Sequence, residues 1–105
     1  MRTVVMHNDA GDVTGFEIGN LLIGRRGVLR VLKRIPAVTI TKAPKAWAFD
    51  DDDFVHFTVN GHKFKAIEPF GDNDRYWIVA EDKAGRSEIE AIRQVFAERR
   101  LFGIF

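Results

Sequence analysis

The positions of apolar and polar residues predict strands along much of the chain. Alternation of the two kinds between residues 37 and 80 is typical of half-buried strands. It predicts five of them, over residues 37–42, 45–49, 53–59, 62–68 and 75–80. Nearer the N-terminus, residues 2–7 predict a short strand, and residues 13–18 predict either a second strand or an irregular approach. The centre of the chain is therefore a run of strands joined by short turns.

Two of these strands are predicted to form a hairpin. They are separated by Asn60 and Gly61, a pair that suits the positive φ angles of a type I′ turn. Alternation then places Val55, Phe57, Val59, His62 and Phe64 on one buried face, and Phe54, His56, Thr58, Lys63 and Lys65 on the other. Because His56 and His62 point to opposite faces, they cannot share a metal ion, and no metal site is predicted.

Two segments have the helical period of 3.6 residues. The first covers residues 24–35, and Pro36 ends it because the residue before a proline avoids helical geometry. The second covers residues 88–100, where Ser87 and Glu90 form a Ser-x-x-Glu capping box. Their apolar stripes are Val28, Val31, Leu32 and Ile35 in the first, and Ile89, Ile92 and Phe96 in the second.

This order of elements predicts an α+β fold, a meandering antiparallel β-sheet with two α-helices packed on one face. The chain has 105 residues, of which 46% are hydrophobic and 30% charged, and we expect a single domain over residues 1–105. It has no cysteine, which excludes disulfides and thiolate ligands. No apolar run suits a signal peptide or a membrane span, so we expect a cytoplasmic protein without membrane contact.

Charge is unevenly distributed, although the net charge is only +1. From Ile18 to Phe49 there are seven bases and no acid, whereas from Asp50 to Glu90 there are eleven acids and five bases. Such asymmetry predicts either a polarised surface or two blocks that face each other in the fold.

The basic block contains the segment "LLIGRRGVLRVLKRI", which resembles the glycine loop of K-homology nucleic-acid-binding domains at Ile23, Gly24 and Gly27. The resemblance implies a backbone clamp on a single strand. In that family the positions three and six residues after the second glycine are apolar, but here they are Arg30 and Lys33. We therefore interpret the segment as a helix start with a solvated basic face. Its cations could bind phosphate without family membership: Arg25, Arg26, Arg30, Lys33 and Arg34.

The acidic block contains a run of four aspartates, followed downstream by two more. A calcium loop starting at Asp50 would need an oxygen ligand and a glycine at the positions of Phe54 and Val55, so that motif fails. The run predicts either a solvated turn between strands or a surface for a basic protein partner. The residues of that surface would be Asp50, Asp51, Asp52, Asp53, Asp72 and Asp74.

These observations favour binding over catalysis, and they predict no catalytic residue and no cofactor. The favoured function is a non-catalytic protein-interaction or inhibitor-type module that uses the acidic residues. The alternative is a nucleic-acid-binding protein that uses the basic helix face. A minimal metal-dependent nuclease comes third, because Glu81 and Lys83 follow a strand downstream of Asp72 and Asp74.

The apolar C-terminus predicts self-association. We favour a homodimer through Phe102, Ile104 and Phe105, with folding of this segment back onto its own sheet as the alternative. Truncation after Arg100 should therefore turn a dimer into a monomer or destabilise the monomer, since each buried side chain of this size contributes about 1.5–3 kcal/mol. Light scattering and thermal unfolding measure the two outcomes. A truncated protein with the same oligomeric state and the same stability as the full chain would contradict both interpretations of the C-terminus.

Overall fold

The computed structural model of the chain describes residues 2–19, 24–43, 53–69 and 75–98. Within these residues, six strands form one antiparallel sheet, together with two α-helices and a short 3₁₀ helix, η2. The strands are β1 (Thr3–His7), β2 (Val13–Gly19), β3 (Val38–Lys42), β4 (Asp53–Val59), β5 (His62–Ile67) and β6 (Arg75–Ala80). The helices are α1 (Gly24–Lys33), η2 (Lys83–Glu88) and α2 (Ile89–Ala97). The strand predicted at 45–49 and the C-terminal residues 99–105 lie outside the described residues.

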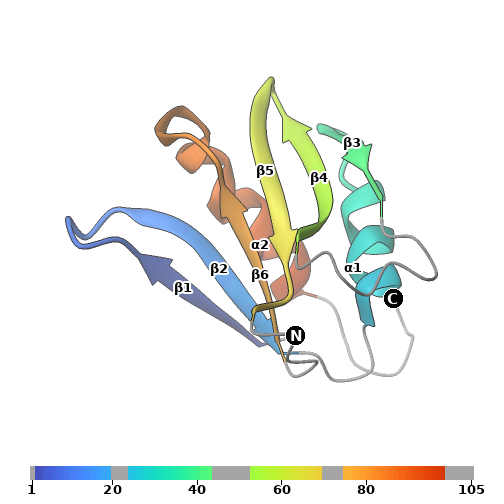
Figure 1. Ribbon diagram of the computed structural model, residues 1–105, viewed down its shortest axis with the longest axis horizontal. Helices are drawn as coiled ribbons and strands as arrows, with labels where there is room; N and C mark the ends of the chain where they lie inside the picture. The colour runs from blue at the N-terminus through green and yellow to red at the C-terminus, as the bar shows by residue number, and fades with distance from the viewer. Residues whose placement is uncertain (1, 20–23, 44–52, 70–74, 99–105) are drawn as a thin grey trace.

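The predicted α+β class is confirmed, and the strand order adds a crossover. Along the sheet the order is β1-β2-β6-β5-β4-β3. The strands β3 to β6 form a meander, β1 and β2 form a hairpin, and the two parts join where β2 pairs with β6. Between β2 and β3 the chain therefore passes from the strand next to the β1 edge to the opposite edge of the sheet by way of α1 (Figure 1).

One face of the sheet and both helices share a single hydrophobic core. Helix α1 packs next to β3, and α2 packs over β1 and β2, behind the sheet as drawn in Figure 1. Aromatic rings join the layers, with 5.7 Å between the ring centroids of Phe16 and Phe96. The core is formed by residues that are less than 5% exposed: Phe16, Ile18, Val28, Val31, Leu32, Phe54, Val55, Phe57, Val59, Phe64, Ala66, Tyr76, Ile78, Ile89, Ile92 and Phe96.

The predicted hairpin forms with the expected register. Asn60 and Gly61 have φ angles of 52° and 82°, as the type I′ turn requires. Lys65 lies opposite His56, and both belong to the outer face of the sheet, on the side away from the helices. The opposite face is buried, as predicted for Val55, Phe57, Val59 and Phe64.

The assignment of Phe54 to the outer face was wrong. The register shifts between Asp53 and Val55, so the extra residue breaks the alternation at this point. Phe54 turns inward instead and is 1% exposed, with its ring edge-on to Tyr76 at 5.2 Å. A β-bulge thus adds the Phe54 ring to the aromatic residues of the core.

The predicted capping box at Ser87 was also wrong. The helical turns start earlier, at η2, where the Asp82 carboxylate accepts a 2.8 Å hydrogen bond from the Gly85 N–H. Because η2 runs directly into α2, the Ile89 N–H already donates to the Arg86 carbonyl, and no side chain caps α2. The Ser87 hydroxyl instead donates to Glu88.

We expect Phe57→Ala to lower the free energy of unfolding by roughly 3–5 kcal/mol, because truncation of a buried aromatic side chain leaves a cavity. Urea unfolding measures this change. The matched control is Lys63→Ala in the same hairpin, where an exposed side chain should change stability by no more than about 0.5 kcal/mol. Equal effects of the two substitutions would show that the assigned faces are wrong.

Candidate functional site: the basic face of helix α1

Helix α1 separates apolar from basic residues on its two sides. Its buried side consists of Gly27, Val28, Val31 and Leu32. The helical turn continues past Lys33, since the Arg34 and Ile35 N–H groups donate to the Val31 and Leu32 carbonyls at 3.1 Å. The exposed side carries four cations, which we call the basic face: Arg26, Arg30, Lys33 and Arg34. At 100° per residue they fall within an arc of about 100°.

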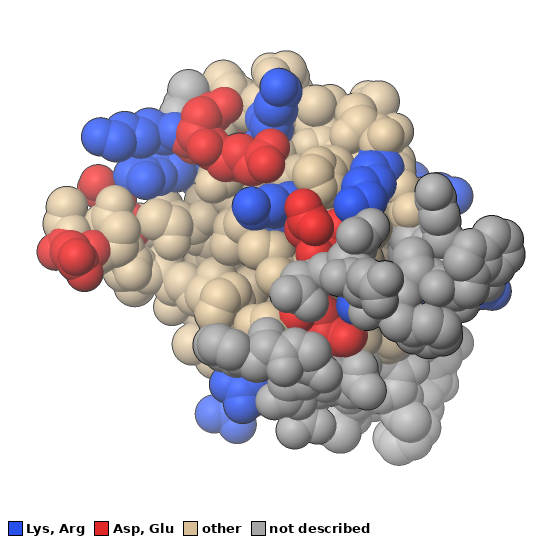
Figure 2. All heavy atoms as spheres, viewed as in Figure 1, with Lys and Arg blue, Asp and Glu red and all other residues tan. Residues whose placement is uncertain are grey.

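No described residue neutralises the basic face. None of its four side chains forms an ion pair or a side-chain hydrogen bond within the described part of the chain. Elsewhere on the molecule, Figure 2 shows basic and acidic side chains next to one another. The basic face is therefore a local concentration of positive charge on a protein whose net charge is only +1.

The glycines Gly24 and Gly27, which lie on either side of Arg26 in the sequence, belong to the helix. Helix α1 starts at Gly24, which has a positive φ of 65°, and Gly27 is buried one turn later. The two glycines of the segment that resembles a K-homology loop thus lie in the first turn of α1, and the described element that precedes α1 is the strand β2. Any binding of anions here depends on the side chains of the basic face.

Arg25 does not belong to the basic face, although the sequence grouped it with these residues. It points toward the end of β5, where its Nε and Nη2 atoms donate to the Glu68 carboxylate at 3.3 Å. Its guanidinium also lies 4.9 Å from the centroid of the Phe54 ring. Arg25 is rotated by about 100° from Arg26 around the helix axis, which explains the separation.

Arg25, which is paired with Glu68, and Tyr76, the only tyrosine of the chain, both lie against the Phe54 ring. Tyr76 is 2% exposed, and its ring contacts Phe54. Burial, and after it the negative charge of Glu68, raises the pKa of Tyr76 to about 12. Sequence patterns could not identify this cluster, because Arg25 and Glu68 are 43 positions apart.

Of the six aspartates predicted to bind a protein partner, the structure describes only Asp53. Its carboxylate lies 2.8 Å from His56 Nε2 and 3.9 Å from Lys42 Nζ. The hydrogen bond with His56 is the main reason that the pKa of Asp53 is lowered. The other five lie outside the described residues: Asp50, Asp51, Asp52, Asp72 and Asp74. The one described member is therefore already paired within the fold.

The remaining candidates are exposed and separate from the core. Glu81 follows β6 and Lys83 begins η2, and both side chains are exposed. Among the residues that the structure describes, no group of three or more His, Cys, Asp or Glu side chains could hold a metal ion. No helix in these ranges is long and apolar enough to cross a membrane.

The pKa of Tyr76 leads to a prediction about alkaline stability. The phenol of the folded protein should ionise near pH 12, whereas that of the urea-unfolded chain should ionise near 10. Since the folded state holds this proton more tightly, the contribution to stability is complete below pH 10 and is lost as the pH rises from 10 to 12. Phenolate absorbance follows the ionisation, and Tyr76→Phe is the control without the signal. A midpoint near pH 10 in the folded protein would contradict the burial of this hydroxyl.

Comparison with known proteins gives no relative for this arrangement: no family model, no curated protein and no solved structure matches the chain.

Proposed function

We propose that the protein binds nucleic acid through the basic face of α1. The observation that carries this proposal is the exposure of Arg26, Arg30, Lys33 and Arg34 on one side of a helix, without an ion pair to any described residue. Such a surface suits the phosphates of a nucleic acid, because each contact between a cation and a phosphate releases condensed counterions and so favours binding. Contacts of this type position the chain on the backbone and read no sequence.

The helix supplies a rigid support for these cations. Val28, Val31 and Leu32 are at most 3% exposed, so the backbone of α1 is fixed against the sheet. Arginine supplies three of the four cations, and its planar guanidinium can donate two parallel hydrogen bonds to one phosphate. Little backbone order has to be gained on binding, which favours association.

The protein-interaction module remains the other prediction. It rests on aspartates of which only Asp53 is described, and Asp53 is already paired with His56 and Lys42. The described contacts therefore favour the nucleic-acid proposal over the acidic surface. A protein that binds a basic partner and no oligonucleotide would reverse this order.

The proposal predicts that the double variant Arg30→Glu, Arg34→Glu loses binding while it stays folded, because both side chains are exposed. Fluorescence anisotropy with labelled DNA and RNA oligonucleotides at low salt measures the affinity. For four phosphate contacts, log K should fall with log salt with a slope of about −3.6 on duplex DNA and about −2.8 on single strands.

The matched control is the double variant Arg2→Glu, Lys83→Glu, which changes the net charge equally at exposed positions outside α1. It should retain most of the affinity. An equal loss in both double variants would mean that net charge alone attracts the nucleic acid. If the unmodified protein retains no oligonucleotide at low salt, the proposed function is wrong.

A further inference from the structure

Three arginines of the basic face form a row along helix α1. Arg26, Arg30 and Arg34 follow one another at intervals of four residues, so they lie on the same side of the helix, and all three are exposed. With a helical rise of about 1.5 Å per residue, neighbours in this row are about 6 Å apart along the axis, and the row is about 12 Å long. Lys33 lies beside the row, one turn after Arg30. The basic face is thus a line of charges.

This row is unfavourable for the helix that carries it. Side chains four residues apart on a helix are neighbours, so Arg26 repels Arg30 and Arg30 repels Arg34. Arg26 also lies in the first turn of α1, near the positive end of the helix dipole. Between Gly24 and Lys33 the sequence has no acidic residue, so α1 itself offsets none of this repulsion.

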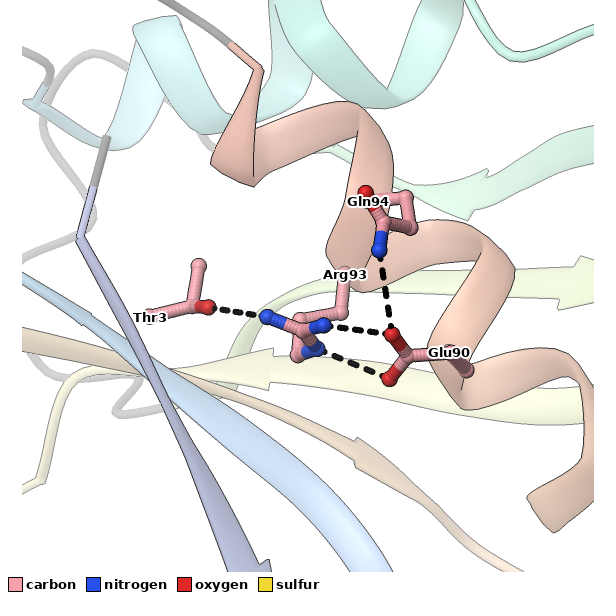
Figure 3. A network of polar contacts seen from close by, with 4 residues as sticks. All are labelled: Thr3, Glu90, Arg93 and Gln94. Carbon is pink, nitrogen blue, oxygen red and sulfur yellow. Dashed lines mark hydrogen bonds and ion pairs between the residues drawn. The ribbon is translucent and has the colours of Figure 1, made fainter.

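Helix α2 shows how a cation is compensated elsewhere in the same fold (Figure 3). Its Arg93 forms an ion pair with Glu90, one turn earlier on the helix, and donates a 2.8 Å hydrogen bond to the Thr3 hydroxyl of β1. Gln94 donates a further hydrogen bond to Glu90 at 3.2 Å. The row on α1 has no partner of this kind among the described residues.

We infer that the row follows one phosphodiester strand, with Arg26, Arg30 and Arg34 on consecutive phosphates and Lys33 on a phosphate beside them. The inference rests on the proposed function of the basic face and names the arrangement of charge that it takes. Consecutive phosphates of one strand lie about 3.4 Å apart along a duplex axis and farther apart through space, because the strand winds around that axis. Arginines about 6 Å apart suit this spacing. The ligand class is therefore a continuous strand, since a single phosphate group would leave most of the row uncompensated.

Two oligothymidylates of equal length and equal charge test the spacing. One carries four consecutive phosphodiesters between neutral methylphosphonate linkages, and the other carries four phosphodiesters that alternate with neutral linkages. We expect the first to bind about tenfold more tightly at low salt, because the second loses at least one charge-assisted contact with the row. Fluorescence anisotropy measures both affinities. Equal affinity overturns the inference but leaves the proposed function in place, whereas binding of no oligonucleotide, unmodified ones included, overturns the proposed function itself.

A displaced cation tests the same row from the protein side. The double variant Arg30→Gln, Ala37→Arg keeps the net charge but moves one cation out of the row, to an exposed position between α1 and β3. We expect it to bind the strand with consecutive charges as weakly as Arg30→Gln alone, with a salt slope that is shallower by about 1. Ala37→Arg alone is the control and should bind no more weakly than the unmodified protein. Full affinity in the double variant would mean that local charge is sufficient, and the row would be overturned.

Discussion

The pairing of β2 with β6 is the contact on which the rest of the fold depends. It joins the N-terminal hairpin to the four-stranded meander and completes the surface that α2 covers. Its register brings Gly15 against β6 so closely that an added Cβ would lie 2.2 Å from the Ile78 carbonyl oxygen. Any larger residue at Gly15 would therefore force the two strands apart, and with them the two halves of the core.

Local signals in the sequence predicted the elements whose contacts are themselves local. Asn60 and Gly61 fix one hairpin through their own φ angles, and Pro36 marks the end of the α1 region. The position of β6 beside β2 could not be derived in this way, because it depends on residues that are far apart in the sequence. Trp77 Nε1, for example, donates a 2.9 Å hydrogen bond to the Glu17 carboxylate, 60 positions away. Phe54 was misplaced because a bulge leaves no mark on simple alternation.

The bases of the basic block have two different environments in the fold. Part of the basic block does face the acidic block, since Arg25 pairs with Glu68 and Lys42 contacts Asp53. Among the described residues, the cations of the basic face pair with no acid, so they form the polarised surface that was the other expectation. The sequence predicted these four residues together with Arg25, and the separate position of Arg25 depended on where the end of β5 lies. The candidate site was thus foreseeable only in its local part.

The hydrogen bond from Arg93 to Thr3 has a consequence for the order of folding. It joins residues 90 positions apart, so nearly the whole chain must exist before α2 can cover β1 and β2. During synthesis the N-terminal hairpin emerges first, but an isolated two-stranded hairpin is at best marginally stable in water. Long-range contacts of this kind slow folding, because the entropy of closing a long loop is lost before the contact forms. Among the described strands, β1 and β2 are made before the others and are therefore among the last to become stable.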